Sequence, residues 1–292
     1  MDTLLASYLH DEQARKSIVE PIFQHRLLLS AAWQIEPGSC VLDVGCGQGE
    51  SSLVLALATG PNGHIVGIDT APPHYGGPYT VAQSQKHIQA SILGNQIEFR
   101  RVDISSLLRD DFDINRPFDT AVLCHSLWYF PSKADISEVF QLLADAKVRY
   151  LCVAEYGLRA SVPEQVPHVL AAHAQATFHA LRKSAPTGVR EPNVRSTPTP
   201  EEIVSLAGQF GWRETRSGYL RPVQRMRDGD WEVQFVLSPL FQEWIREEHL
   251  EENESLAAKI RAVKESTKKL RTEEVVKWDT MDVFWAVLEL EA

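Results

Sequence analysis

Three glycines alternate with other residues directly after a short apolar run, and no other part of the chain indicates its chemistry as clearly. The segment Val41–Glu50 reads VLDVGCGQGE, and residues with helical spacing follow it. Glycine lets the backbone turn tightly and lets a ligand lie against it, because no Cβ stands in the way. The pattern predicts a buried strand, a ligand-binding turn and then a helix.

Two classes of ligand compete for such a turn. A dinucleotide fingerprint needs glycine or alanine at position 50, where the helix N-terminus meets a pyrophosphate. This chain has Glu50 there, and an anionic side chain disfavours an anionic ligand. S-adenosylmethionine carries no phosphate, and its ammonium and sulfonium suit Asp43 and nearby carbonyls. The turn therefore favours S-adenosylmethionine, with NAD as the alternative.

Acidic residues end the next two predicted strands. Asp69 lies 20 residues after Gly49, where a carboxylate can accept hydrogen bonds from both ribose hydroxyls of either nucleoside ligand. Asp103 ends the third strand and could accept from an adenine amino group, while Ile104 packs on the ring. These positions extend the predicted cofactor site along the edge of the sheet.

The fourth predicted strand opens into an aromatic loop. The segment Pro117–Phe130 reads PFDTAVLCHSLWYF, and we expect the tip of the loop to lie where the methyl group of the cofactor points. Cys124 ends the strand and is placed among the cofactor-binding residues. His125 follows it and is the first candidate for a general base; the alternative is that it hydrogen-bonds the backbone and shapes the pocket.

Further candidates surround this loop. Glu155 ends the fifth strand at the same edge, where it could bind a cationic acceptor, accept a proton or serve as a structural hydrogen-bonder. Trp128 and Tyr129, with Phe130, could form a wall for a planar substrate or a cage around a cationic amine, or belong to the core.

The segment between 188 and 200 is predicted to be a loop rich in proline and threonine. Its Asn193 and Arg195 could close over the substrate or contact the fifth-strand acid, and an ordinary surface loop is the alternative. His168, His173 and His179 share one predicted helix without the i,i+4 spacing of a metal pair, so we expect no metal site.

Short β-rich runs alternate with helix-period segments through the first half of the chain, which predicts a parallel sheet with helices on both faces. Strands at 212–219 and 282–290 complete a doubly wound α/β fold, a seven-stranded mixed sheet whose last hairpin is antiparallel. The first five predicted strands are Cys40–Val44, Ile65–Asp69, Ile97–Val102, Phe118–Cys124 and Val148–Glu155.

The length suits one domain, residues 1–292, with helical additions at both ends. Residues 1–35 are predicted to be a helical cover that Pro21 divides in two, and 36–156 the cofactor-binding core. Residues 157–211 are predicted to cover the substrate, and 212–292 to hold the last strands with a helical insertion at 239–276. Residues 231–237 fit a helix or a strand equally well.

The four motifs, in this order and spacing, resemble the class I S-adenosylmethionine-dependent methyltransferases, in particular the UbiE-like small-molecule group, over residues 35–160. The segments 69–73, 127–130 and 193–195 are also similar to fungal secondary-metabolite methyltransferases that act on nitrogen or sulfur in gliotoxin-type pathways. The resemblance implies that Asp69 binds ribose and that Asp103 and Ile104 bind adenine. It assigns the methionine moiety to Asp43, Gly45, Cys46, Gly47, Gln48 and Gly49.

Composition excludes some partners. A net charge of −10 supplies no basic field for a phosphate backbone, so no nucleic acid is expected. The four cysteines stand apart, as reduced thiols of a cytoplasmic protein do. No apolar stretch reaches the roughly 20 residues that span a bilayer, so no membrane association is expected.

These observations predict an enzyme that transfers a methyl group from S-adenosylmethionine to a nitrogen, sulfur or oxygen atom of a small metabolite in secondary metabolism, releasing S-adenosylhomocysteine. In-line displacement at carbon depends mainly on positioning, with a base where the acceptor must lose a proton. An NAD(P)-dependent oxidoreductase and a non-catalytic, repurposed methyltransferase fold are the alternatives. The acceptor atom and the oligomeric state stay open.

Overall fold

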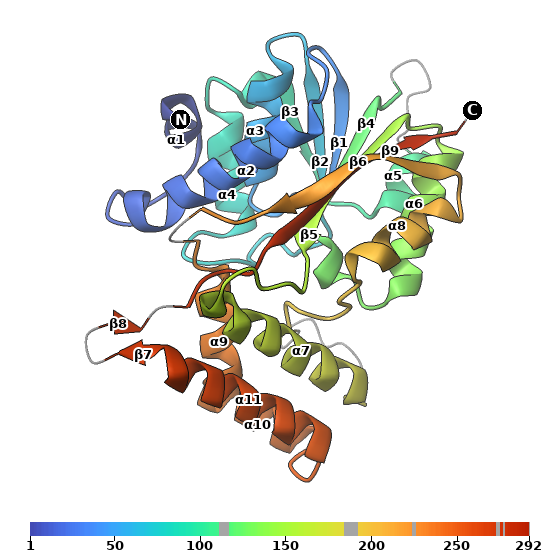
Figure 1. The fold of residues 1–292 in the computed structure, drawn as a ribbon. Helices are drawn as coiled ribbons and strands as arrows, with labels where there is room; N and C mark the ends of the chain where they lie inside the picture. The colour runs from blue at the N-terminus through green and yellow to red at the C-terminus, as the bar shows by residue number, and fades with distance from the viewer. Residues whose placement is uncertain (111–116, 184–191, 224–225, 273–274, 277, 292) are drawn as a thin grey trace.

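The computed structural model describes residues 1–110, 117–183, 192–223, 226–272, 275–276 and 278–291. Seven strands form one sheet in the order β3-β2-β1-β4-β5-β9-β6 (Figure 1). The first five are parallel, and β9 runs antiparallel to β5 and β6, so the predicted mixed sheet is confirmed. The strands are β1 (Cys40–Val44), β2 (His64–Ile68), β3 (Ile97–Arg100), β4 (Thr120–Cys124), β5 (Tyr150–Tyr156), β6 (Trp212–Leu220) and β9 (Val283–Leu290).

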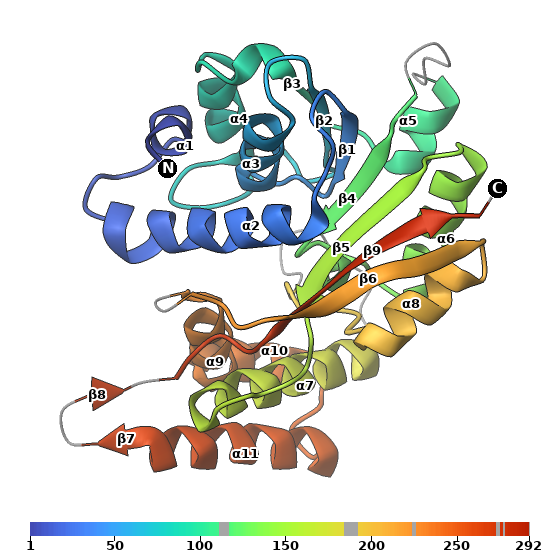
Figure 2. The same cartoon turned by 45° about the horizontal axis from the view of Figure 1, so that its top comes forward.

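Helices cover both faces of the sheet because successive strand residues point to opposite sides. Val41 and Val122 belong to one buried cluster, with α2 and α3, whereas Leu42 and Ala121 belong to the other, with α5, α6 and α8. Figure 2 shows α2 and α3 on one side of the strands and α6 and α8 on the other. These helices are α2 (Glu20–Trp33), α3 (Glu50–Thr59), α5 (Ile104–Asp110), α6 (Lys133–Asp145) and α8 (Pro200–Gly208).

The N-terminal segment differs in detail from the prediction. Pro21 lies in the first turn of α2, where its missing N–H is no loss, so it begins the helix instead of dividing one. A short π-helix, Arg15–Val19, leads into α2, and α1 (Asp2–Ser7) precedes it. On the same side of the sheet, α4 (Val81–Gln89) begins at a Thr80 capping box.

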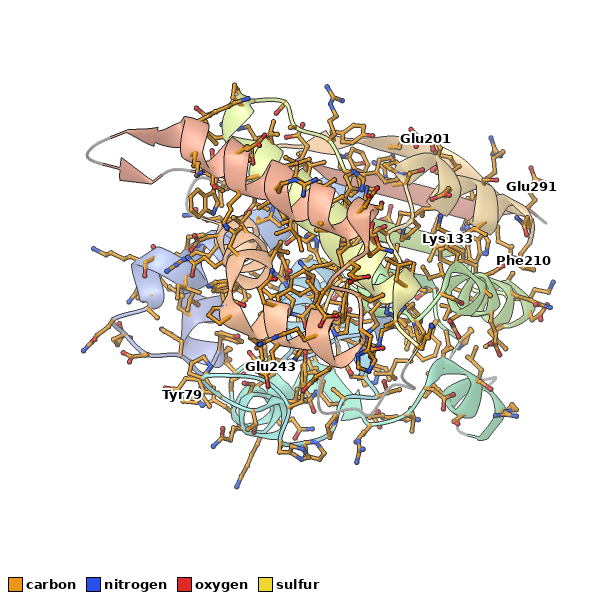
Figure 3. All side chains as sticks on the ribbon, turned by 90° about the horizontal axis from the view of Figure 1, so that it is seen from below. Tyr79, Lys133, Glu201, Phe210, Glu243 and Glu291 are labelled. Atoms are coloured by element: carbon orange, nitrogen blue, oxygen red, sulfur yellow. The ribbon has the colours of Figure 1, made fainter. Side chains whose placement is uncertain are left out.

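A separate layer of helices packs below the sheet. It comprises α7 (Val166–Leu181), α9 (Asp228–Leu237), α10 (Pro239–Glu247) and α11 (Glu254–Leu270), which share an apolar core of their own. Figure 3, seen from below, shows this layer in front of the sheet. Residues 231–237 are therefore helical. Among the described residues, no helix combines the length and apolar character needed to cross a bilayer.

Two predicted segments each comprise more than one kind of structure. The stretch 239–276 is not helical throughout, because α11 ends at Leu270 and a short hairpin of β7 (Arg271–Thr272) and β8 (Val275–Val276) follows. Within the described part of segment 157–211, α7 lies in the lower layer, whereas α8 packs against α6 and β6. Positions 188–191 of the predicted loop lie outside the described residues.

The connections that follow β1 and β4 run to opposite faces of the sheet. The segment after β1 enters α3 on one face of the sheet, whereas the segment after β4 leads to α6 on the other. In doubly wound sheets, the carboxyl ends of two such strands bound a crevice where ligands bind. The turns after Val44 and Cys124 are therefore the positions where a ligand is expected to bind.

Gly49→Ala is expected to destabilise the fold more than Gly47→Ala. Both glycines have positive φ, +97° and +53°, so alanine at either costs about 1–2 kcal/mol of backbone strain. At position 49 the new Cβ would also lie 2.6 Å from Ile88 Cδ1 and 2.9 Å from Phe99 Cζ, whereas at 47 nothing lies within 4 Å. Urea denaturation should therefore show an extra loss of about 1–3 kcal/mol for Gly49→Ala. Equal losses would contradict this packing.

Candidate active site

Hydrogen bonds with neighbouring residues fix the conformation of the glycine turn. Asp69 Oδ2 accepts from the Gly47 N–H at 2.7 Å, and its Oδ1 accepts from Ala71 N–H at 2.8 Å. Gln85 on α4 donates to the Gly47 carbonyl at 2.9 Å. The acid predicted to bind ribose therefore lies directly against the middle of the turn, and α4 fixes the other side.

The residue that follows the N-terminal helix α1 contacts the same turn. The hydroxyl of Tyr8, the residue after α1, donates to Glu50 Oε1 at 2.8 Å and lies 3.1 Å from Gln48 Oε1. The Gln48 amide in turn donates to the carbonyl of Tyr79, whose position Figure 3 labels. Tyr8 is 8% exposed, so a segment 40 residues upstream forms part of the wall around the turn.

Asp43 lies under the turn and is 1% exposed. Burial raises the pKa of its carboxyl to about 7, although the hydrogen bond from Ser52 opposes this shift. That hydroxyl donates to Asp43 Oδ2 at 2.6 Å. A buried carboxyl near its pKa can charge when a cationic ligand arrives.

The adenine-side candidates lie at the end of β3. Asp103 is exposed and begins α5, where its carboxylate accepts from the N–H and the hydroxyl of Ser106. The Ser106 N–H lowers the pKa of Asp103, so the carboxylate is charged at neutral pH. Ile104 is 7% exposed and packs into the core on that face. Binding of adenine by this pair stays a prediction.

His125 adopts a left-handed backbone conformation directly after β4, with φ +55°. Its N–H donates to the Ala154 carbonyl of β5 at 2.8 Å, which fixes the turn. Non-glycine residues in this region carry strain and occur often at functional sites. The preceding Cys124 is buried, and burial raises the pKa of its thiol to about 11, so it stays protonated.

Two histidines meet at this turn. His125 Nε2 lies 3.0 Å from Nε2 of His25, a fully buried residue of α2. Burial, with a smaller contribution from His125, lowers the pKa of His25 well below its ordinary value, so His25 is neutral. One proton therefore lies between the two rings, and the tautomer of His125 depends on His25.

The two catalytic candidates from the sequence lie side by side. His125 Nδ1 is 3.6 Å from Glu155 Oε1 and has no hydrogen-bond partner among the described residues. Glu155 is 1% exposed and accepts the N–H groups of Trp128 at 3.1 Å and Tyr156 at 2.9 Å. The carboxylate thus has a structural role and also faces His125 Nδ1.

A cavity of about 120 Å³ opens beside these residues. Of the predicted substrate residues, Trp128, Tyr129 and Asn193 line it, whereas the Arg195 side chain donates to the Pro192 carbonyl at 3.1 Å. The Arg195 N–H donates to the Trp128 carbonyl, so this loop is joined to the aromatic loop. The lining comprises Arg26, His125, Trp128, Tyr129, Glu155, Tyr156, Asn193, Val194, Asp228 and Glu232.

Sequence reasoning missed several residues around this cavity and the turn, among them Tyr8 and Tyr156. His25 and Arg26 come from α2, and Asp228 and Glu232 come from α9. The polar residues His25 and Arg26, which directly precede the apolar run Leu27–Leu29 of this helix, were a usable signal. No comparable signal marked α9, because its position beneath the sheet edge depends on packing against α7 and α11.

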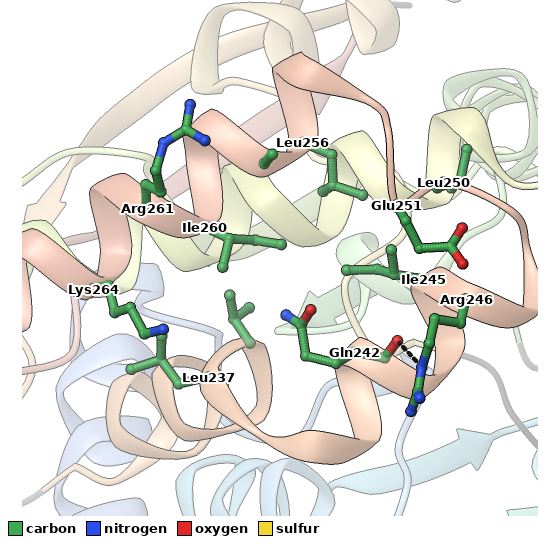
Figure 4. A pocket seen from close by; sticks show the side chains of 12 residues that line it. Leu237, Gln242, Ile245, Arg246, Leu250, Glu251, Leu256, Ile260, Arg261 and Lys264 are labelled. Atoms are coloured by element: carbon green, nitrogen blue, oxygen red, sulfur yellow. Dashed lines mark hydrogen bonds between the residues drawn. The ribbon is translucent and has the colours of Figure 1, made fainter.

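A larger cavity, about 390 Å³, lies within the lower helical layer (Figure 4). Apolar residues such as Leu237, Ile245 and Ile260 line it, with Arg261 and Lys264 also in the wall. All of its lining residues come from α9, α10, α11 and the connection between them, and none comes from the strand ends. It is therefore separate from the glycine turn and the His125 cavity.

The predicted histidine helix carries no metal cluster in the part of the chain that the structure describes. His168 Nδ1 accepts from the Met281 N–H at 3.0 Å, and burial lowers the pKa of this histidine to about 4. It is therefore a neutral core histidine.

Comparison with known proteins identifies the class. Residues 35–194 match the family described as "Methyltransferase domain", and the chain belongs to that family. With the mixed seven-stranded sheet and the glycine turn, it is a class I S-adenosylmethionine-dependent methyltransferase, and the oxidoreductase alternative is set aside.

The chain is similar to particular proteins along its whole length. The methyltransferases phomM' and phomM of Diaporthe leptostromiformis are each 34% identical, over 99% of this chain and 89% of the relative. A cyclopropane-fatty-acyl-phospholipid synthase-like protein of Lactobacillus casei has TM-score 0.78 at 26% identity, covering 99% and 98%. The [4+2]-cyclase SpnF shares the fold, with TM-score 0.55 at 16% identity, covering 99% and 92%.

The contribution of the Asp43 carboxyl to the free energy of unfolding of the cofactor-free protein is expected to fall as pH rises from 3.8 to about 7, whereas the buried histidines His25 and His168 contribute with the opposite sign. Asp43 has an ordinary pKa of 3.8 and a folded pKa of about 7, so between these values the folded state holds a proton that the unfolded state has released. Its contribution is complete below 3.8 and is lost as pH rises through 7. Burial raises the pKa of Glu232 to about 7 as well, with the same sign.

Asp43→Asn isolates this effect, because asparagine is neutral throughout and its carbonyl can still accept from Ser52. Urea denaturation across this pH range should show that the free energy of unfolding of the wild type decreases relative to that of Asp43→Asn as pH rises. An unchanged slope would show that Asp43 is already ionised in the folded protein.

Proposed function

We propose that this enzyme binds S-adenosylmethionine along the glycine turn and transfers its methyl group to a nitrogen, sulfur or oxygen atom of a small metabolite in the His125 cavity. The observation that carries the proposal is the adjacency of the two sites across the β1–β4 crevice. Ser126, next to His125, donates to the Val44 carbonyl at 2.8 Å, which joins the two turns.

The turn and its neighbours supply a group for each part of the cofactor. Asp43 and the segment 45–49 face the methionine moiety, and Asp69 is in reach of ribose. Asp103 and Ile104 would hold the adenine. Arg26, whose Nε lies 3.4 Å from Ser51 Oγ, offers its guanidinium to the methionine carboxylate. The bound cofactor supplies an electrophilic methyl carbon on a sulfonium, and the sulfur leaves as a neutral thioether.

His125 receives the proton of the acceptor in this proposal. The proposal requires the tautomer in which His125 Nε2–H donates to His25, so that the lone pair on Nδ1, beside Glu155, receives the proton. Glu155, 3.6 Å away, stabilises the imidazolium that forms. Positioning of the acceptor in line with the methyl carbon supplies most of the rate enhancement, and the base adds to it.

The cellular setting is also a proposal. The resemblance of segments 69–73, 127–130 and 193–195 to fungal secondary-metabolite methyltransferases supports a role in secondary metabolism, and similarity to the two Diaporthe proteins supports methyl transfer. The small cavity supports a small-molecule acceptor, and the net charge of −10 disfavours nucleic acid. The four cysteines are free, which supports a reducing compartment such as the cytoplasm.

Asp69→Ala is expected to weaken binding of S-adenosylhomocysteine, because the ribose loses an anionic acceptor and the Gly47 N–H loses its partner. Titration calorimetry should show a loss of about 1–3 kcal/mol, or roughly 5- to 150-fold in Kd.

Asp119→Ala is the matched control, since Asp119 accepts the Cys40 N–H at the opposite edge of the sheet. It should leave the affinity within about twofold, a change below 0.5 kcal/mol. No binding by the wild type, or equal losses in both variants, would contradict the cofactor assignment.

His125→Ala is expected to lower kcat by about 10²- to 10⁴-fold for an acceptor that must lose a proton. Binding of S-adenosylhomocysteine should change little, because Asp69 and the glycine turn stay intact. Steady-state assays with an acceptor found by screening would measure the effect, with exposed His173→Ala as the control. Unchanged kcat and an unchanged pH profile would show that His125 only shapes the pocket.

A further inference from the structure

We propose that the acceptor is an amine that binds as its ammonium ion, and that Asp228 and Glu232 of α9 form its recognition site. The inference deepens the proposed function and rests on it, because it names the chemistry of the molecule that shares the cavity with the cofactor. Four independent features of the cavity carry it.

The first feature is the charge of the lining. Three carboxylates, Glu155, Asp228 and Glu232, face the cavity together with a single guanidinium, that of Arg26. Arg26 lies beside Ser51 and Glu50 on the cofactor side and also interacts with Asp228 across the cavity. If the methionine carboxylate takes Arg26, the acceptor side keeps a surplus of negative charge. A cation offsets that surplus, whereas a neutral or anionic molecule does not.

The second feature is an unsatisfied oxygen. Asp228 Oδ2 is buried and has no hydrogen-bond partner among the described residues. The Tyr156 hydroxyl interacts with the same carboxylate, and burial, with Asp228, raises the pKa of Tyr156 above its ordinary value. One side of the Asp228 carboxylate is therefore directed by Tyr156, and the other lacks a donor. A buried carboxylate oxygen without a donor is costly unless a ligand supplies one.

The third feature is the way Glu232 is held. Its carboxylate accepts from the Gln175 amide of α7 and interacts with the Asn193 amide of the loop. Burial raises the pKa of Glu232 to about 7, even though these amides oppose the shift. An approaching cation favours the charged form of such a carboxyl, so the ammonium ion and the ionised carboxylate stabilise each other.

The fourth feature is aromatic. Trp128 and Tyr156 have ring centroids 5.1 Å apart, and Tyr129 lies in the same lining. Aromatic faces attract ammonium ions by about 0.5–2 kcal/mol, and more strongly where water is excluded. Aromatic faces combined with carboxylates suit an ammonium ion better than a hydroxyl or a thiol.

Oxygen and sulfur acceptors fit the same lining less well. An alcohol or thiol brings one donor, which can satisfy Asp228 Oδ2 but leaves the surplus charge uncompensated. An ammonium ion brings up to three donors and a positive charge, enough for both α9 carboxylates and a third contact at His125. The preference for a nitrogen acceptor thus follows from the number of hydrogen-bond donors on the ammonium ion as well as from its positive charge.

The reaction balances with residues already in place. The ammonium gives one proton to His125 Nδ1 and becomes an amine with a free lone pair. That lone pair forms the new N–C bond to the methyl carbon while the C–S bond breaks, and its electron pair leaves on sulfur. The product is an N-methylammonium ion, which Asp228 and Glu232 still bind, together with S-adenosylhomocysteine.

Binding of matched probes tests the proposal. The probes are 2-phenylethylamine, 2-phenylethanol and 2-phenylethanethiol, which differ only in the acceptor atom. Each is titrated into the full-length protein saturated with S-adenosylhomocysteine, at a pH one unit above the Glu232 pKa of about 7. The amine should bind at least roughly tenfold more tightly than either neutral probe, since hydrogen bonds between charged groups are the stronger ones.

Substitutions of the α9 carboxylates test which residues cause the preference for the amine probe. Asp228→Asn and Glu232→Gln should each weaken binding of the amine by roughly tenfold and leave the two neutral probes within about twofold. Asp230→Asn is the control on the same helix, because Asp230 pairs with Arg227 and Gln234 outside the cavity lining. It should leave all three affinities unchanged.

The outcomes separate the two proposals. Failure of the wild type to bind S-adenosylhomocysteine would contradict the proposed function itself. Normal cofactor binding with no amine binding, with equal affinity for all three probes, or with an amine affinity that the α9 variants do not change, would overturn the amine proposal alone. Turnover of the thiol or alcohol but not of the amine would also overturn it.

Discussion

The close approach of the turns after β1 and β4 is the constraint on which the site depends. A Cβ on Gly45 would lie 2.6 Å from Ser126 Cβ, so only glycine allows the two turns to meet. Ser126 then joins them through its bond to the Val44 carbonyl, and His125 takes a left-handed conformation beside it. One contact thus forms the crevice in which ligands of doubly wound sheets bind. The same contact places the candidate base at its mouth.

Helices from distant parts of the chain divide this crevice into two electrostatic halves. On the cofactor side, α2 brings Arg26, and Tyr8 after α1 closes on Glu50. On the acceptor side, α9 brings Asp228 and Glu232. Arg26 contributes to both halves, since Glu50 and Asp228 both stabilise its charge. Under the two proposals, this division would let one site hold S-adenosylmethionine on one side and an ammonium ion on the other.

The sheet and its cofactor edge could be predicted because their signals are local. A strand followed by alternating glycines indicates its own turn, and the Thr199 capping box at the start of α8 is a signal of the same local kind. Contacts between distant segments carry no such signal. His25 reaches His125 across 100 positions, and Asp228 reaches the cavity only because α9 packs on α7. Pro21 was misread because proline breaks a helix interior but suits its first turn.

A structure of the protein with S-adenosylhomocysteine bound tests the central claim most directly, because that claim concerns the placement of one sulfur atom. We expect the ligand to lie along residues 45–49 with its ribose on Asp69, and its sulfur to face the cavity formed by His125, Glu155 and α9. A ligand in the larger cavity among α9, α10 and α11, or a sulfur turned away from His125, would contradict it.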